Sequence, residues 1–231
     1  MMEVLVDKWE AYLYEKYITH GGRKAVFNIS GGTDSALALD LLCEFLTKYN
    51  IEDYTITPLH GWDTRRKSAY SPTAARDVLN FIQNRWPSIT IKDMCVFAYH
   101  KEKHESKEKY HRPMYEYFKK EGLVDSYMIF SGGTLTPRDP AFIVNDDGAK
   151  VSRDVDSYNE MTKGSYKDSG ILTSYDKKWV AQQYKDRNLM DLFPKTESCV
   201  SMNRYSKPPC KECYWCKEKY WAFGMYDGGI K

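Results

Sequence analysis

The run Lys24-Ala-Val-Phe-Asn-Ile-Ser-Gly-Gly-Thr-Asp-Ser35 carries the strongest structural pattern in this sequence. Residues 25–29 are a short apolar run with β-branched and aromatic members, which predicts a buried strand. Residues 36–46 are good helix formers and apolar on most faces, which predicts a largely buried helix. Residues 30–35 therefore form a glycine turn between a strand and a helix.

Such a turn favours the binding of an anion. Glycine lets the backbone approach a ligand closely, the first N–H groups of a helix point outward, and the helix dipole favours negative charge. The turn contains neither Gly-Lys-Ser/Thr nor Gly-x-Gly-x-x-Gly, which excludes the mononucleotide P-loop and the dinucleotide fingerprint. An ordinary turn with a Thr or Asp helix cap is the alternative without a ligand.

Ser-Gly-Gly-x-Asp-Ser after a strand resembles the PP-loop of the ATP pyrophosphatases. That superfamily cleaves ATP between the α and β phosphates, adenylates a substrate and releases pyrophosphate. The resemblance implies a nucleotide-binding loop made of Ser30, Gly31, Gly32, Thr33, Asp34 and Ser35. It also implies that ATP and Mg²⁺ are the cofactors, that Asp34 and Ser35 act in catalysis, and that Asp34 positions Mg²⁺ or the turn itself.

The rest of the chain alternates between helical and strand patterns. Strands are predicted at 54–59, 89–99 and 127–130, and helices at 4–18, 73–86, 112–120 and 176–188. This alternation predicts an α/β fold with a doubly wound, mostly parallel sheet, and ligands bind such sheets beyond the carboxyl ends of the strands. The loops at Ser30, His60 and Ser131 should therefore share one edge. His60 and the glycines of a second Ser-Gly-Gly, Gly132 and Gly133, are further candidates for cofactor binding.

The last four cysteines form a second constellation: Cys199, Cys210, Cys213 and Cys216. Thiolates at i and i+3 on a tight knuckle can converge on one tetrahedral ion, and nearby lysines would offset the negative charge of four thiolates. The lysines in question are Lys207, Lys211, Lys217 and Lys219. We predict a closed structural Zn²⁺ site, with an iron–sulfur cluster or two disulfides as the alternatives. Cys43 and Cys95 are interpreted as core thiols.

Composition limits the other partners. The length of 231 residues and the 42% apolar fraction suffice for one α/β domain with a small appendage. The formal net charge of +2 gives no argument for nucleic acid or an anionic membrane. No apolar run reaches membrane-spanning length and no signal-peptide pattern opens the sequence, so we expect a cytoplasmic protein without a membrane partner. Whether it is a homodimer stays open.

We expect three parts along the chain. Residues 1–23 are interpreted as an N-terminal helical extension and residues 24–190 as the PP-loop ATP-binding domain. Within that domain, residues 135–169 show little periodicity and are interpreted as a long loop or lid. Residues 191–231 are interpreted as the zinc-binding segment.

A PP-loop followed by Cys-x10-Cys-x2-Cys-x2-Cys resembles the 7-cyano-7-deazaguanine (preQ0) synthase family of queuosine biosynthesis. The order of elements matches over about residues 24–224. The stretch from Asp176-Lys177 through Glu197-Ser198-Cys199 resembles that family's late helix with its lysine, which implies a catalytic role for Lys177. The family adenylates the carboxylate of 7-carboxy-7-deazaguanine, takes in ammonia to give an amide, and activates again to leave the nitrile. No side-chain nucleophile is needed, because the protein positions the reactants and stabilises charge.

The sequence departs from the family at several places. The family's Cys-Gly-x-Cys is Cys210-Lys-Glu-Cys213 here, and the arginine soon after its last cysteine is replaced by Lys217 or Lys219. Its Tyr-Pro-Asp-Cys-Arg pattern is not recognisable near residues 136–139, and a helix is predicted before the nucleotide strand, where the family starts almost at once. The alternatives are a PP-loop sulfur-transfer enzyme (tRNA thiolation or PAPS-reductase-like) and a nucleotide-binding module without turnover. An exposed Cys95 with a lowered pKa would favour sulfur transfer.

Overall fold

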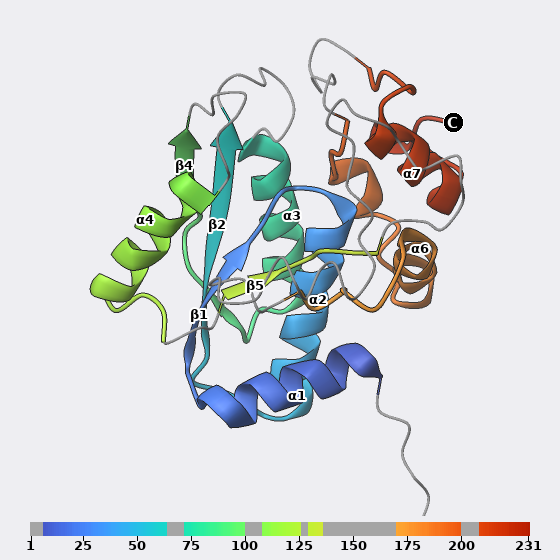
Figure 1. Cartoon of the computed structure of the whole chain (residues 1–231). Coiled ribbons are helices and arrows are strands. Elements are labelled where there is room, and N and C mark those ends of the chain that lie inside the picture. The colour runs from blue at the N-terminus through green and yellow to red at the C-terminus, as the bar shows by residue number, and fades with distance from the viewer. Residues whose placement is uncertain (1–6, 64–71, 100–107, 126–128, 136–169, 200–207) are drawn as a thin grey trace, which may run out of the picture.

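The computed structural model describes residues 7–63, 72–99, 108–125, 129–135, 170–199 and 208–231 (Figure 1). Its first half contains α1 (Lys8–His20), β1 (Lys24–Asn28), α2 (Thr33–Lys48), β2 (Thr55–Asp63), α3 (Pro72–Arg85), β3 (Thr90–Ile91) and β4 (Cys95–Tyr99). Its second half contains α4 (Glu108–Lys120), β5 (Ile129–Ser131), α6 (Lys177–Asp186) and α7 (Tyr214–Phe223), with short 3-10 helices at Phe193–Lys195 and Asp227–Gly229. The predicted lid at 135–169 falls, apart from residue 135, outside the described residues.

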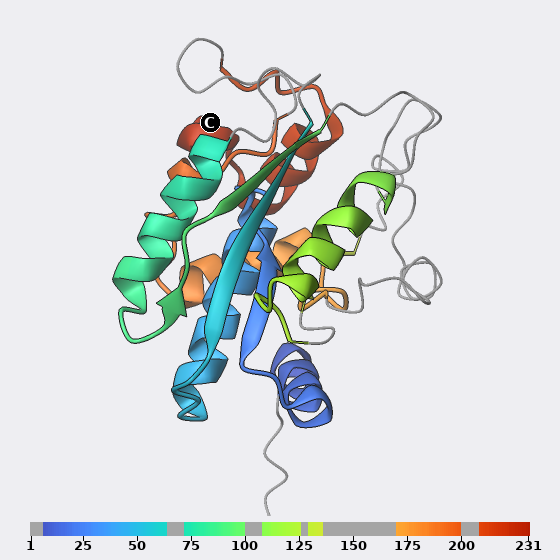
Figure 2. The same cartoon turned by 90° about the vertical axis from the view of Figure 1, so that its left-hand side faces the viewer.

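The strands form one sheet in the order β3-β2-β1-β5, with β4 also paired to β2. Every pairing among the described strands is parallel. Helices α2 and α3 cover one face and α4 lies over the other, as the two views at 90° show (Figures 1 and 2). The predicted α/β fold with a mostly parallel, doubly wound sheet is confirmed.

The position of β1 in the sheet marks the expected ligand edge. From β1 the chain moves outward to β2, β3 and β4, and then crosses to the opposite side of β1 as β5. The carboxyl end of β1 is therefore the point at which the strand order reverses, where α/β sheets form a ligand crevice. The turn that begins with Ser30-Gly31-Gly32 lies at this point.

The sheet differs from the sequence prediction along one edge. The single strand expected at 89–99 is two short strands, β3 and β4, which follow each other along β2. Between the pairs Ile56–Ile91 and Leu59–Cys95, β2 advances three residues while its partner advances four, so one extra residue is accommodated, as in a β-bulge. Pairing with β4 also extends β2 to Asp63, four residues beyond the predicted end.

Two helices, α1 and α7, lie outside the central α/β unit. Helix α1 packs on the main core through Trp9 and Leu13, which are both buried. Helix α7 is absent from the sequence prediction because its buried face includes Glu218 and Lys219, so it lacks an apolar stripe. No helix in the described part of the chain is long and apolar enough to span a membrane.

Candidate nucleotide loop and cysteine cluster

The loop between β1 and α2 is closed by its own serines. The backbone N–H of Ser30 donates to Ser35 Oγ (3.2 Å), and the N–H of Gly32 donates to Ser30 Oγ (3.2 Å). The Ser35 hydroxyl donates to the carbonyl oxygen of Gly32 (3.1 Å), and the two serine oxygens lie 2.9 Å apart. The loop is thus preformed. A ligand would have to compete with these serine contacts or add to them.

Two glycines shape the backbone of the loop. Gly31 has φ +81°, and a Cβ there would lie 2.9 Å from both Ala74 Cβ and the backbone nitrogen of Ala75. Gly32 is the N-cap of α2 and makes no side-chain cap. The start of this 16-residue helix therefore combines the dipole of α2 with N–H groups that have no capping side chain at Gly32, an arrangement suited to phosphate.

The second Ser-Gly-Gly meets the first. A Cβ on Gly132 would lie 2.5 Å from the backbone oxygen of Asp34 and 2.6 Å from the nitrogen of Ser35. Gly132 and Gly133 are partly buried at the end of β5, beside the first turn of α2. The sequence placed both runs at one edge of the sheet, and the structure brings Gly132 into backbone contact with the loop.

The carboxylate of Asp34 lies in a polar cluster at the start of α2. It forms an ion pair with the ammonium of Lys177, the first residue of α6, and Oδ2 accepts a hydrogen bond from the hydroxyl of Thr134 (3.3 Å). Lys177 Nζ also lies 3.4 Å from the hydroxyl oxygen of Thr33, and the lysine is 5% exposed. The structure therefore joins Asp34 to Lys177, which the sequence had selected separately.

Tyr184 and Thr134 were missed by the sequence analysis. The hydroxyl of Tyr184 donates to the backbone oxygen of Thr33 (3.1 Å), and burial raises the pKa of Tyr184 well above its ordinary value, so the hydroxyl stays protonated. Tyr184 lies on the buried side of α6, with Val180 and Ala181. The helical pattern of α6 could have shown that Tyr184 is buried, but no local signal pairs it with Thr33.

His60 occupies a different place from the one expected. It lies within β2 instead of in a loop after the strand, and it is completely buried. Its Nδ1 is 2.8 Å from the backbone oxygen of Ile29, the residue before the loop. This contact holds the backbone at the end of β1, directly before the glycine loop begins at Ser30. The imidazole therefore has a structural role next to the loop.

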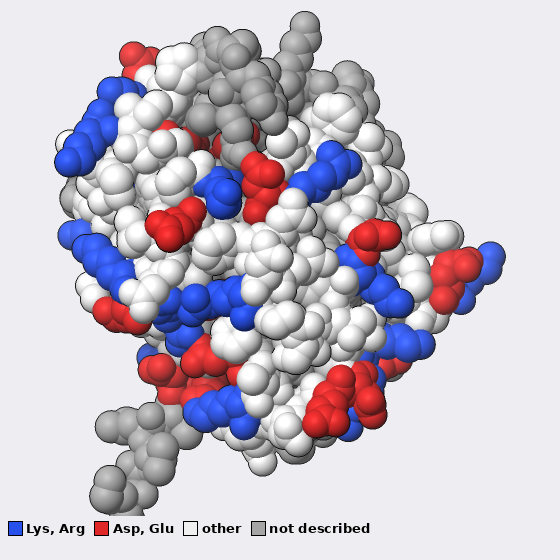
Figure 3. Space-filling view, turned by 180° about the vertical axis from the view of Figure 1, so that it is seen from behind, with Lys and Arg blue, Asp and Glu red and all other residues white. Residues whose placement is uncertain are grey.

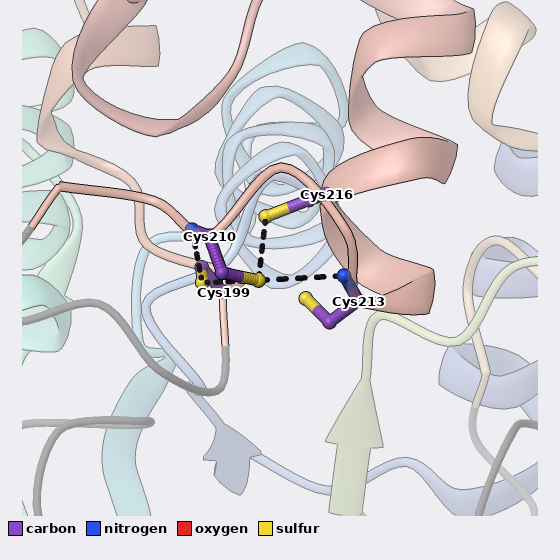
Figure 4. A group of neighbouring side chains, drawn as sticks. All are labelled: Cys199, Cys210, Cys213 and Cys216. Atoms are coloured by element: carbon purple, nitrogen blue, oxygen red, sulfur yellow. Dashed lines mark hydrogen bonds between the residues drawn. The ribbon is translucent and has the colours of Figure 1, made fainter.

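The four C-terminal cysteines converge, as Figure 4 shows. Their sulfur atoms all lie within 4.8 Å of one another, with Cys199–Cys210 at 3.6 Å and Cys210–Cys216 at 3.9 Å. Zn–S bonds of about 2.3 Å at tetrahedral angles place sulfurs about 3.8 Å apart, so the residues fit one zinc ion. All four are free thiols, separated by more than the roughly 2.05 Å of a disulfide bond. The spacing of the four sulfurs suits a single metal ion.

The surroundings of the cluster also suit a metal. Backbone N–H groups donate to the sulfurs of Cys199 and Cys210, each at 3.3 Å, as is typical of groups that orient metal ligands. Contact with Cys213, followed by burial, raises the pKa of Cys216 far above its ordinary value. A bound cation would favour the thiolate instead.

The lysines are arranged differently from the prediction. Lys219 is buried and pairs with the carboxylate of Asp227, so its charge is already matched. Lys211 and Lys217 are exposed, and Lys207 lies outside the described residues. Asp227 also accepts the N–H groups of Ser198 (2.8 Å) and Cys199 (2.7 Å) through its second oxygen.

Residues 196–199 connect the cluster to the glycine loop. The N–H of Glu197 donates to the backbone oxygen of Gly31 (2.9 Å), and a Cβ on Gly32 would lie 3.4 Å from the hydroxyl oxygen of Ser198. Lys219 Nζ is 2.8 Å from the hydroxyl oxygen of Thr196. The first cysteine of the cluster therefore follows directly after residues that touch the loop.

The two remaining cysteines have the features of core thiols. Cys43 is fully buried in α2, and burial raises its pKa well above the ordinary value. Burial also raises the pKa of Cys95, which is half-buried in β4, and the Asp93 carboxylate adds to the effect. Neither thiol is activated as a nucleophile. The face seen in Figure 3 carries both basic and acidic side chains.

The chain resembles known proteins in structure but not in sequence. No protein-family model matches the sequence, and curated proteins give no match either. The chain is similar in structure to NMN synthetase from Francisella tularensis, with a TM-score of 0.44 and 10% sequence identity, over 94% of this chain and 90% of that one.

Proposed function

We propose that this protein is an ATP pyrophosphatase of the PP-loop type, which transfers AMP to a carboxylate and releases pyrophosphate. We further propose that the carboxylate is 7-carboxy-7-deazaguanine or a related deazapurine acid and that ammonia is the second substrate, so that the product is preQ0. In this proposal residues 24–190 bind ATP and residues 191–231 bind zinc.

The Asp34–Lys177 pair at the start of α2 is the observation that carries the proposal. Phosphates seated on the loop would meet the helix N-terminus, the serine hydroxyls and the Lys177 ammonium, all of which favour negative charge. The carboxylate of Asp34 could hold Mg²⁺ at the same place, and that ion would neutralise charge on the departing pyrophosphate. These groups lie where the strand order reverses, the expected position of a ligand crevice.

Adenylation suits this set of residues. A carboxylate is a poor electrophile, and transfer of AMP to it creates a good leaving group that ammonia can displace to give the amide. A second transfer of AMP from ATP, to the amide oxygen, would let that oxygen leave with AMP and the nitrile form. The protein needs to orient two reactants and stabilise phosphate charge, and no nucleophilic side chain is required. The raised pKa values of Cys43 and Cys95 make adenylation a better match than sulfur transfer.

The choice of a deazapurine acid rests on the resemblance in sequence. The PP-loop and the cysteine spacing occur in that order in the preQ0 synthase family. The cysteine cluster, with four sulfurs and no open position, is expected to be structural because catalytic zinc keeps a site for water or substrate.

The test is a product analysis with purified protein, ATP and Mg²⁺. Reactions with and without 7-carboxy-7-deazaguanine and ammonium are analysed for AMP and pyrophosphate, and mass spectrometry follows the purine. The proposal predicts AMP release that depends on the purine, and a nitrile product. If AMP is released only with another acid, the deazapurine substrate is rejected and the cleavage of ATP to AMP and pyrophosphate is retained. If a folded, zinc-loaded protein releases no AMP with any acid, the alternative of a nucleotide-binding module without turnover is favoured.

A further inference from the structure

Glu218 lies at the junction between the cysteine cluster and the glycine loop, and no part of the proposed chemistry uses it. It belongs to α7 and its side chain is completely buried. One carboxylate oxygen is 3.9 Å from Lys177 Nζ, and the other accepts a hydrogen bond from the hydroxyl of Tyr214 (3.3 Å). A buried carboxylate is costly without such partners.

Helix α7 is fixed by the cysteines at its start. Cys213 is its N-cap and Cys216 lies in its first turn. Successive helical residues turn by about 100°, so Cys216 and Glu218 project from nearly opposite sides. One side of α7 therefore meets the cysteine cluster, and the other meets Lys177.

Lys177 lies between two carboxylates, that of Asp34 from α2 and that of Glu218 from α7. If Asp34 binds a Mg²⁺ ion that accompanies the phosphates, the ion pair between Lys177 and Asp34 is weakened. Glu218 then remains as the buried carboxylate that holds the Lys177 ammonium in place. Without Glu218, Lys177 and Mg²⁺ would compete for the single carboxylate of Asp34.

We infer that Glu218 is a positioning residue for nucleotide binding, which acts by holding the Lys177 ammonium at the glycine loop. The inference rests on the proposed function, because Lys177 needs positioning only if phosphates bind there. It assigns α7 a second role: the helix that begins at one candidate metal ligand, Cys213, and contains another, Cys216, would also carry the counter-ion of the nucleotide site.

The direct test is isothermal titration calorimetry with Mg²⁺ and the ATP analogue that has a methylene group between the α and β phosphates. This probe binds without being cleaved there. The Glu218→Gln variant keeps the size of the side chain and removes its charge, and we expect it to bind the analogue about tenfold more weakly than wild type, which corresponds to the loss of one modest interaction. Metal content, measured by mass spectrometry, should be unchanged.

A matched control and a second variant separate positioning from damage to the fold. Glu212→Gln makes the same substitution at an exposed site beside the cluster and should bind like wild type. Tyr214→Phe removes only the hydroxyl that contacts Glu218 and should weaken binding by about two- to threefold. If Glu218→Gln does not fold, Tyr214→Phe decides the matter.

Dependence on Lys177 is tested without ligand by urea unfolding. Because Glu218 and Lys177 contact each other, the changes caused by Glu218→Gln and Lys177→Met should not add in the double variant. Additive changes would overturn the inference, and so would wild-type binding of the analogue by Glu218→Gln. A wild-type protein that fails to bind the analogue would instead reject the proposed function, and the inference with it.

Discussion

Gly132 lies against the backbone of Asp34 so closely that a single added carbon could not be accommodated. A Cβ on Gly132 would come within 2.5 Å of the Asp34 oxygen, which belongs to the first turn of α2 and cannot swing away as a side chain could. The end of β5 is thereby held against the glycine loop, although the two positions lie nearly one hundred residues apart in the sequence.

Gly132→Ala should therefore displace β5 from the loop. We expect Mg²⁺–ATP affinity to fall by at least tenfold and the free energy of unfolding to fall by about 1–3 kcal/mol, the usual cost of forcing an extra methyl group into a packed site. Calorimetry with the non-cleavable ATP analogue and urea unfolding measure the two effects. Gly122→Ala is the control for nucleotide affinity, because a Cβ there meets no atom within 4 Å, although its φ of +63° makes the substitution cost some stability as well. It should leave nucleotide affinity unchanged, and equal losses of affinity in both variants would contradict this account.

The charge of Asp34 should matter more than its shape. Asp34→Asn keeps the volume but removes the charge of one of the two carboxylates that face Lys177. We expect AMP release to fall by on the order of 100-fold, as is typical when one electrostatic group at a reacting centre is lost. Asp191→Asn makes the same change at an exposed position and should have no effect. Unchanged turnover in Asp34→Asn would exclude a catalytic role for this carboxylate.

Removal of one cysteine ligand should release the metal and loosen the loop together. Cys213→Ser is expected to lower the bound zinc from one ion per chain to almost none, and to lower the thermal midpoint, because metal binding contributes folding free energy. Nucleotide affinity should fall as well. Glu197 lies two residues before Cys199, the first cysteine of the cluster, and its backbone N–H donates to the Gly31 oxygen. Cys95→Ser is the matched control. Full zinc content in Cys213→Ser would show that the cluster is not a four-thiolate site.

The role of His60 can be separated from ligand binding by two substitutions. Asn can place an N–H near the position of the imidazole Nδ1, whereas Leu cannot. His60→Leu would leave the Ile29 oxygen without this contact and should cost about 1–3 kcal/mol of stability, while His60→Asn should cost less. Urea unfolding measures the difference. Equal stability of the two variants, with a selective loss of ATP affinity, would instead mean that His60 contacts the nucleotide.

The sequence revealed the parts of the site that follow local patterns. The strand, glycine turn and helix at 25–46 occupy consecutive residues, and Cys210, Cys213 and Cys216 fall within seven residues. Their backbone geometry follows from hydrophobic runs, glycine and spacing, and the parallel sheet follows from the alternation of strands with helices. Lys177 was found only through its resemblance to a family motif.

Contacts between distant elements could not be predicted in this way. Thr134 is 100 residues from Asp34, and Tyr184 is 151 residues from Thr33. Nothing in the local sequence distinguishes Glu218, on a helix of alternating charged and aromatic residues, from a solvent-exposed glutamate. Its burial results from the packing of α7 against α6, which only the folded chain shows.

The most direct test of the central claim is to determine which bond of ATP is broken. Purified protein is incubated with ATP, Mg²⁺, ammonium and a panel of carboxylic acids that includes 7-carboxy-7-deazaguanine, and the products are resolved by phosphorus NMR. The account predicts AMP and pyrophosphate in equal amounts, formed by wild type and lost in Asp34→Asn. ADP and phosphate, or nucleotide products that Asp34→Asn forms equally well, would contradict it.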